Sequence, residues 1–446
     1  LNFCRLYIVT YNVATRNPDG DLLQILNLKP DQKSGFPDFY LIGLQEVKSQ
    51  PQNFIMDALF DDPWTNAFRQ TLMPFGYIKI KTVRLVGLVL TVFCLRKHVI
   101  HLRDMQSVCT RTGLMGLWGN KGGISLRLQI YGCSICFVNC HLTPHDHLLP
   151  ERINDYNAIL QNQKFQSREA ITIMFHDYIF WFGDLNFRLG DIESLSAVEI
   201  ERMIKRNQFE SLLERDQLRK VMSSGDAFSE LVEEELSFPP TYKYLFNSEE
   251  YDLKRRPGWT DRILYKVNTN AYENVTLEAK STSYRSFHHC CTSDHKPVTG
   301  EFTVKVFSNY VERMVKFLPL QTWFINEVNY AVCIIGSDVT PTMWDWIGVY
   351  ADNFTSLDDY YSYIYLPVNN EEVVTNSHEI QSAAKIIPSA TRDRIELRFH
   401  EGMMRSPGKY RLIYFSQDSS SVLGMSSSFL AQHRDSGDVT SSYLEW

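Results

Sequence analysis

Runs of β-branched and aromatic residues recur along the first part of the chain and indicate its fold. Residues 6–13 (Leu-Tyr-Ile-Val-Thr-Tyr-Asn-Val) are largely apolar and aromatic, a pattern typical of a buried strand. Apolar residues at three- and four-residue spacing predict helices over 153–165 and 195–213. Because strands and helices alternate, we expect a layered α/β domain over residues 1–306. Further strands are predicted by similar runs at 38–44, 85–95, 123–130, 134–140, 178–182 and 298–306.

The pattern changes near residue 307, where short strand-like runs follow one another without a convincing helix. Such runs, separated by turn-rich spacers, predict a smaller all-β sandwich over 307–416. Residues 417–446 are rich in serine and are predicted to form a disordered tail, with a last strand at 422–430. The predicted strands of the sandwich lie at 330–335, 346–350, 361–366, 394–399 and 410–415.

Length and charge favour a two-domain protein that does not act on nucleic acid. A chain of 446 residues exceeds the roughly 250–300 residues at which a single core stops growing. Residues 1–306 contain 35 Lys/Arg and 35 Asp/Glu, whereas the remainder contains 10 and 17. A nucleic-acid enzyme would normally carry a basic domain or stripe.

The composition also indicates the cellular compartment and the kind of membrane contact. The chain has no apolar run long enough to form a transmembrane helix, so any membrane contact is expected to be peripheral. Nine cysteines at irregular spacing, without a recognisable signal peptide, favour the reducing cytoplasm. The first residue is Leu, which leaves open a processed start or a missing upstream segment.

Polar residues at the ends of predicted strands indicate a phosphate-handling metal site. Asp184 and Asn186 follow the apolar run 178–182 and, if the strand continues, point to the same side. Asn12 ends the first strand and Glu46 ends the second. Because Mg²⁺ prefers one or two carboxylates and retains several waters, Glu46 is the best candidate for a direct ligand. Taken singly, each of these residues is more often a solvated strand terminus.

A histidine near the end of the first domain is a candidate phosphate-binding group. His295 lies in the segment 293–298 (Ser-Asp-His-Lys-Pro-Val), next to an apolar strand. A carboxylate partner would fix its tautomer and keep it protonated, and either Asp261 or Asp294 could serve. An isolated histidine of this kind would more often be a surface residue with its hydrogen bonds satisfied.

Eight motifs occur in one order along the first domain, and together they resemble the inositol polyphosphate 5-phosphatases. The resemblance implies a two-sheet α/β sandwich of the endonuclease/exonuclease/phosphatase superfamily and Mg²⁺-dependent hydrolysis of the 5-phosphate. The motifs are 10–13 (Thr-Tyr-Asn-Val), 42–46 (Ile-Gly-Leu-Gln-Glu), 118–123 (Trp-Gly-Asn-Lys-Gly-Gly), 139–142 (Asn-Cys-His-Leu), 183–186 (Gly-Asp-Leu-Asn), 239–243 (Pro-Pro-Thr-Tyr-Lys), 259–262 (Trp-Thr-Asp-Arg) and 293–297 (Ser-Asp-His-Lys-Pro).

The resemblance also implies residue roles. Asn12 and Glu46 would lie at the metal, and Asp184 and Asn186 would position or activate the attacking water. Such in-line chemistry depends on positioning and charge neutralisation more than on covalent catalysis. The resemblance implies that His295, paired with Asp261, stabilises the scissile phosphate and that His141 contacts it. Asp294 would complete the acidic cluster.

Positively charged residues are the candidates for substrate recognition. By resemblance, Asn120 and Lys121 face the 1-phosphate, and Tyr242 and Lys243 are associated with a 4-phosphate. Phosphatidylinositol 4,5-bisphosphate and the 3,4,5-trisphosphate are therefore the leading substrates, soluble inositol polyphosphates remain open, and such activity would attenuate phosphoinositide signalling. The basic run 254–256, which begins with Lys254, favours headgroup or anionic-membrane contact although such runs are usually solvated, and Arg262 is predicted to join it.

The second domain resembles the SKICH domain that follows the catalytic domain in some 5-phosphatases. The resemblance rests on 344–350 (Trp-Asp-Trp-Ile-Gly-Val-Tyr), 360–363 (Tyr-Tyr-Ser-Tyr) and 408–416 (Gly-Lys-Tyr-Arg-Leu-Ile-Tyr-Phe-Ser), although most of these aromatics would also fit a plain sandwich core. It implies protein partners for this domain and recruitment of a cytoplasmic protein to the plasma membrane, with the endoplasmic reticulum as a second candidate.

The sequence is also compatible with two other functions. The same superfamily core cleaves nucleic acid, so a nuclease-type phosphodiesterase is one rival, disfavoured by the neutral charge and by Tyr242 and Lys243. A catalytically silent scaffold that binds phosphoinositides or partners through its second domain is the other. It is disfavoured because every expected catalytic residue is present.

Overall fold

A computed structural model describes residues 3–20, 22–48, 61–113, 121–167, 170–190, 195–307, 314–366, 384–387 and 394–434. The chain divides into two compact units. The first comprises residues 1–96 and 106–308, and the second residues 97–105 and 309–446. Within the described residues, none of the helices is both long enough and apolar enough to cross a membrane.

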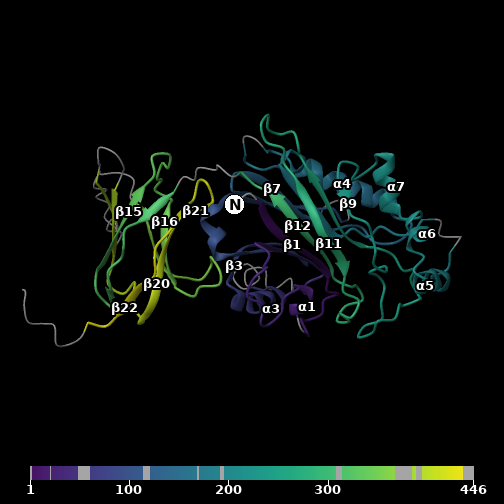
Figure 1. Cartoon of the computed structure of the whole chain (residues 1–446), viewed down its shortest axis with the longest axis horizontal. Coiled ribbons are helices and arrows are strands. Elements are labelled where there is room, and N and C mark those ends of the chain that lie inside the picture. The colour runs from purple at the N-terminus through teal and green to yellow at the C-terminus, as the bar shows by residue number, and fades with distance from the viewer. Residues whose placement is uncertain are drawn as a thin grey trace, which may run out of the picture. The chain divides into compact units, whose positions relative to one another are not determined.

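The first unit is built on two mixed sheets of six strands each. In the first sheet, β1 pairs in parallel with β2 and antiparallel with β12, and β12 pairs with β11. β1, β12 and β11 lie side by side in Figure 1. The strand order is β11 (Ala279–Ser286), β12 (Val298–Lys305), β1 (Phe3–Asn12), β2 (Phe39–Gln45), β4 (Leu88–Leu95) and β3 (Tyr77–Leu85). Every residue of β2 is buried, as expected for an uninterrupted apolar strand in the middle of a covered sheet.

The second sheet supplies most of the residues discussed below. Its strand order is β5 (Leu102–Arg111), β6 (Gly122–Ile130), β7 (Cys133–His141), β8 (Tyr178–Asp184), β10 (Asp261–Val267) and β9 (Val232–Glu233). Strands β7 and β8 are parallel, with His141 opposite Asp184, and β10 runs antiparallel to β8, with Asp261 opposite Asp184. This register brings the three side chains to one edge of the sheet.

The two sheets approach closely near that edge. A Cβ added to Gly43 of β2 would lie 2.4 Å from the ring of Phe182 in β8, so only glycine fits between the sheets at this position. Buried Asn139 of β7 accepts a hydrogen bond from Gln45 Nε2 (2.7 Å) and donates to the carbonyl oxygens of Leu44 (3.2 Å) and Val89 (2.8 Å). These bonds join β7 to both β2 and β4.

Helices and short 3₁₀ turns complete the first unit. The predicted helix over 153–165 is confirmed as α4, which begins and ends earlier than expected. The predicted helix over 195–213 is divided into α5 and α6, because Asn207 between them has a left-handed φ of 54° that ends the first helix. The described helices are α1 (Leu22–Ile25), α3 (Pro63–Leu72), α4 (Leu149–Asn162), α5 (Ala197–Lys205), α6 (Phe209–Leu213) and α7 (Gln217–Ser224), with 3₁₀ turns η2 (Met73–Phe75) and η5 (Ile173–Phe175). A further 3₁₀ turn, η3 (Arg96–His101), falls almost wholly in the segment 97–105 of the second unit.

The second unit is a β structure formed by a four-stranded and a six-stranded sheet. Its buried core includes Trp323, Leu397 and Tyr414. The strands are β13 (Val315–Phe317), β15 (Asn329–Ile335), β19 (Arg394–Phe399) and β18 (Ala384–Ile387) in one sheet, and β14 (Trp323–Phe324), β22 (Phe429–Gln432), β20 (Gly408–Ser416), β16 (Trp346–Ala351), β17 (Tyr360–Tyr365) and β21 (Ser421–Met425) in the other.

The described fold of the second unit continues past the boundary expected at residue 416. In place of the single last strand at 422–430, β21 pairs with β20 and β22 pairs with both β20 and β14. Val422 and Ala431 are buried, so this serine-rich stretch contributes apolar side chains to the core. The remainder of the predicted disordered tail, residues 435–446, lies outside the described residues.

Candidate active site

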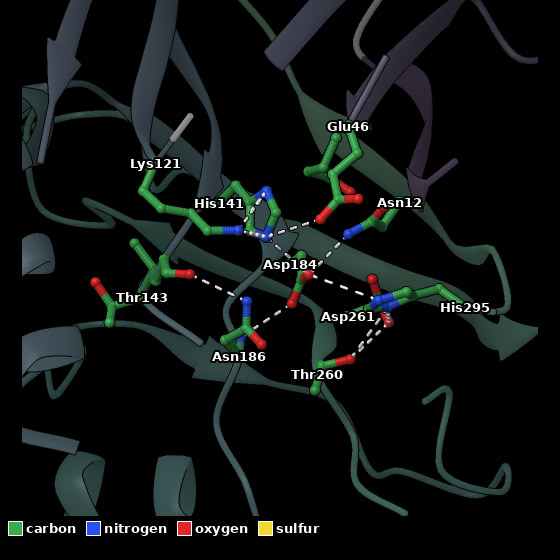
Figure 2. A network of polar contacts seen from close by, with 12 residues as sticks. Asn12, Glu46, Lys121, His141, Thr143, Asp184, Asn186, Thr260, Asp261 and His295 are labelled. Carbon is green, nitrogen blue, oxygen red and sulfur yellow. Dashed lines mark hydrogen bonds and ion pairs between the residues drawn. The ribbon is translucent and has the colours of Figure 1, made fainter. Parts of the chain in front are cut away.

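Side chains from both sheets of the first unit meet at the ends of their strands (Figure 2). Asn12 ends β1, Glu46 directly follows β2, and His141 and Asp184 end β7 and β8. The carboxyl ends of parallel strands lie at the same edge, which is why residues far apart in sequence converge here. Asp261, at the start of antiparallel β10, reaches the same edge.

Asp184 lies at the centre of this arrangement. Its Oδ2 accepts a hydrogen bond from Asn12 Nδ2 (3.0 Å) and lies 3.2 Å from His141 Nε2. Burial alone would raise the pKa of Asp184, but His141, His295 and Lys121 outweigh burial and lower it well below its usual range. Asp184 is therefore an ionised carboxylate at neutral pH, although it is almost fully buried.

The predicted pairing of His295 with a carboxylate is present, and the partner is Asp261. The distance from His295 Nδ1 to Asp261 Oδ2 is 2.9 Å, and the same oxygen accepts hydrogen bonds from Thr241 Oγ1 (2.7 Å) and Thr260 Oγ1 (2.9 Å). Burial would lower the pKa of His295, but Asp261 first and Asp184 second raise it to about 9. His295 is thus an imidazolium at neutral pH.

His141 has the opposite protonation preference. Burial, followed by the ammonium of Lys121, lowers the pKa of His141 below its usual value despite the nearby Asp184. Lys121 Nζ lies 3.3 Å from His141 Nδ1, and burial lowers the pKa of Lys121 as well. Lys121 therefore points toward His141 and the cluster around Asp184, and its predicted contact with a 1-phosphate stays a prediction.

Asn186 reaches the site by a different route from the one expected. Strand β8 ends at Asp184, and Asn186 adopts a left-handed φ of 57°, so strand alternation does not place it. Its backbone N–H donates to Asp184 Oδ1 (3.1 Å), and its side-chain Nδ2 donates to the carbonyl of Leu142 (3.0 Å). Its Oδ1 accepts from Arg188, a residue that the sequence analysis did not single out.

Glu46 also has a left-handed backbone, with a φ of 55°. Its carboxylate is one-third exposed, and Oε1 lies 3.9 Å from His141 Nε2. Non-glycine residues held in this region cost free energy and cluster at functional sites. The occurrence of two such residues, Glu46 and Asn186, beside one buried carboxylate supports a functional interpretation of this edge.

The oxygen donors at this edge fit a hard divalent cation. Glu46 offers a partly exposed carboxylate, and Asn12 is a neighbouring amide whose Oδ1 accepts one hydrogen bond, from the N–H of Ala14 (3.0 Å). One carboxylate with open surroundings leaves room for the waters and phosphate oxygens that Mg²⁺ retains. The residues present are therefore compatible with the predicted Mg²⁺ site.

The residues predicted to bind substrate lie in different surroundings. The ring of Tyr242 packs on His295, with centroids 4.5 Å apart, and Lys243 Nζ lies 3.3 Å from Asp294 Oδ2. Asp294 is thus paired with a lysine, in the segment that carries His295. Lys254 is exposed, and Asn120 lies outside the described residues.

The prediction that Arg262 joins a substrate-binding patch is wrong. Arg262 is fully buried, its Nη1 lies 3.1 Å from Asp216 Oδ2, and its Nη2 forms an ion pair with Glu233. Successive residues of a strand point to opposite faces, so β10 directs Asp261 to the active site and Arg262 away from it. Arg262 is a structural residue.

The sequence analysis did not single out several residues that hold the site in place. Thr241 and Thr260 hold Asp261, and Ser293 Oγ donates to the carbonyl oxygen of Asn12 (2.6 Å), which fixes the segment before His295. Their positions within the motifs 239–243, 259–262 and 293–297 were the available signal.

This fold and the carboxylate–histidine centre define the endonuclease/exonuclease/phosphatase class. The model of endonuclease/exonuclease/phosphatase family 2 matches residues 9–301, and the SKICH domain model matches residues 315–432. Inositol polyphosphate 5-phosphatase K of Mus musculus is 32% identical over 95% of this chain and 89% of its own length. The chain belongs to the inositol polyphosphate 5-phosphatases that carry a SKICH domain.

Two further relatives extend the comparison. Phosphatidylinositol 4,5-bisphosphate 5-phosphatase A of Rattus norvegicus is 35% identical over 95% of this chain, which spans only 41% of that relative. The 5-phosphatase domain of a synaptojanin, solved with inositol (1,4)-bisphosphate and a calcium ion, is 28% identical, with a TM-score of 0.58 over 68% of this chain and 85% of its own. The role of the second unit in targeting stays a prediction.

Proposed function

We propose that this chain hydrolyses the 5-phosphate of phosphatidylinositol 4,5-bisphosphate and phosphatidylinositol 3,4,5-trisphosphate in a Mg²⁺-dependent reaction. The observation that supports this most is the buried, ionised Asp184 between neutral His141 and the His295–Asp261 pair. The named relatives support the substrate class, because one is a phosphatidylinositol 4,5-bisphosphate 5-phosphatase. The synaptojanin domain was solved with a compound that retains the 1- and 4-phosphates and lacks a 5-phosphate.

In this proposal Asp184 orients the attacking water and accepts its proton. A carboxylate that stays ionised inside a buried site can accept that proton without first losing one, but its lowered pKa makes it a weak base, so its larger contribution is to orient the water. Asn186 is held by hydrogen bonds to Asp184 and to the Leu142 carbonyl, and its side-chain amide would lie beside that water. The reaction needs an aligned water more than covalent help.

Positively charged side chains around Asp184 would receive the phosphate. The imidazolium of His295 can donate from Nε2, because Asp261 occupies Nδ1. Lys121 adds an ammonium beside His141. Glu46 and Asn12 would hold Mg²⁺, which when bound would neutralise negative charge on the phosphate oxygens.

A release assay tests the proposal. Short-chain phosphatidylinositol 4,5-bisphosphate and 3,4,5-trisphosphate should release phosphate with Mg²⁺ and not after chelation by EDTA. Phosphatidylinositol 4-phosphate and the 3,4-bisphosphate, which lack a 5-phosphate, are the matched controls and should remain intact. Undetectable release from both leading lipids and from soluble inositol phosphates would refute the enzyme proposal, and cleavage of DNA instead would favour the nuclease rival.

The protonation of His295 predicts a pH dependence. Because its pKa is raised to about 9, the imidazolium persists below that pH and is lost above it, so kcat/KM should fall as the pH rises through about 9. Asp261→Asn removes the charge that most stabilises the imidazolium of His295. The alkaline decrease in kcat/KM should therefore move to lower pH by about one unit or more. Initial rates measured across the alkaline range check this shift.

The control for this experiment is Asp252→Asn, since Asp252 lies outside the cluster and accepts a bond from the backbone of Lys254. Its profile should match the wild type. An Asp261→Asn profile with an unmoved alkaline limb would contradict the assignment of that limb to His295.

A further inference from the structure

A second group of potential metal ligands lies on the surface of the first unit, apart from the Asp184–Asp261–His295 cluster. Glu249, His288 and His289 each place one ligand atom within 4.8 Å of the others. His289 Nδ1 lies 2.7 Å from Glu249 Oε1, and the His288 and His289 rings are 4.1 Å apart between centroids. The chemistry proposed above uses none of these side chains.

Hydrogen bonds already join the two loops that carry these residues. Buried Lys296 donates from Nζ to the carbonyl oxygens of Ser248 (3.0 Å) and Cys290 (3.0 Å), one from each loop. The N–H of Asn247 also donates to the carbonyl of Cys291 (2.9 Å). Because the loops are fixed before any ion arrives, binding would not have to order the backbone.

The donor set selects a particular class of cation. Two imidazoles and one carboxylate suit Zn²⁺ and neighbouring transition metals, whereas Mg²⁺ prefers oxygen ligands. Zinc–ligand bonds of about 2.0–2.2 Å place tetrahedral ligand atoms about 3.3–3.6 Å apart. Small rotations of three exposed side chains would bring the present separations, which include 2.7 Å between His289 Nδ1 and Glu249 Oε1 and reach up to 4.8 Å, into that range.

We propose that Glu249, His288 and His289 bind a divalent transition-metal ion of the Zn²⁺ type, with water completing the coordination. The site lies on segments that continue into the active centre. Tyr244, two residues after Tyr242, donates its N–H to the carbonyl of Asp294 (2.9 Å), which precedes His295. An ion bound here would add one more link between the two loops, which continue into the segments of Tyr242 and His295.

Titration calorimetry with Zn²⁺ on the full chain tests the proposal. The protein is first stripped with EDTA and then saturated with Mg²⁺, so that the active centre does not compete for zinc. We expect one zinc ion per chain, and we expect His288→Ala, His289→Ala and Glu249→Gln each to weaken its binding about tenfold or more. His433→Ala, which removes an exposed histidine elsewhere, is the control and should bind as the wild type does.

Three outcomes would overturn the proposal. These are unchanged affinity in the histidine variants, displacement of the zinc by excess Mg²⁺, and loss of binding only in the Cys290→Ser/Cys291→Ser double variant. Because the substituted ligands are exposed, the variants should keep the wild-type melting temperature without zinc, and the zinc-induced rise in that temperature should disappear only in the ligand variants.

Discussion

Asp184→Asn is expected to lower kcat about 10³-fold, within the range for loss of a general base. Asparagine keeps the shape of the side chain and can still bond the backbone N–H of Asn186, but it cannot accept a proton from water. The substitution also removes the negative charge among His141, His295 and Lys121. Initial rates of phosphate release from phosphatidylinositol 4,5-bisphosphate, with the thermal unfolding midpoint measured alongside, check this expectation.

Asp345→Asn is the matched control, because Asp345 is a fully buried carboxylate of the second unit that accepts a hydrogen bond from Tyr414 Oη (2.7 Å). Its kcat should remain within about twofold of the wild type, far inside the range expected for loss of a base. If Asp184→Asn folded normally and lost less than about tenfold in kcat, Asp184 would not be the base.

Arg262→Ala is expected to lower the free energy of unfolding of the first unit by about 3–5 kcal/mol, because it leaves two buried carboxylates without their partner. The guanidinium of Arg262 pairs with Asp216 and Glu233, and its side chain is fully buried. Urea denaturation followed by tryptophan fluorescence measures the loss.

Lys205→Ala is the control for this loss. Lys205 and Glu201 form a pair in α5 in which the lysine side chain is 70% exposed, and exposed pairs contribute about 0–1 kcal/mol. A stable Arg262→Ala protein with a raised KM would restore the substrate-binding role that the structure argues against.

The strands that could be predicted are those with continuous apolar sequence. Strands β1, β2 and β7 are buried over most of their length, so their composition alone indicates them. β3 and β11 were missed because they are edge strands with polar residues, such as Lys79, which pairs with Asp61. An edge strand is determined by its neighbour more than by its own hydrophobicity.

The site was predictable as a set of motifs but not as a geometry. Motif order brought Asn12, Glu46, Asp184 and His295 together, whereas no spacing argument could choose between Asp261 and Asp294 as the partner of His295. The choice depends on the register that sets Asp261 opposite Asp184. The same register directs Arg262 to the other face of β10, and a one-residue difference in strand position cannot be seen in the sequence.

The hydrogen bond from Asn12 to Asp184 joins residues 172 positions apart, one from each sheet. Contacts between such distant positions form late in folding, because a long loop must close before they can be made. A partly folded chain with only one sheet formed would therefore contain only half of the proposed catalytic residues and would be inactive. Phosphatase activity recovered during refolding would report the docking of the two sheets, an event that secondary-structure signals alone do not follow.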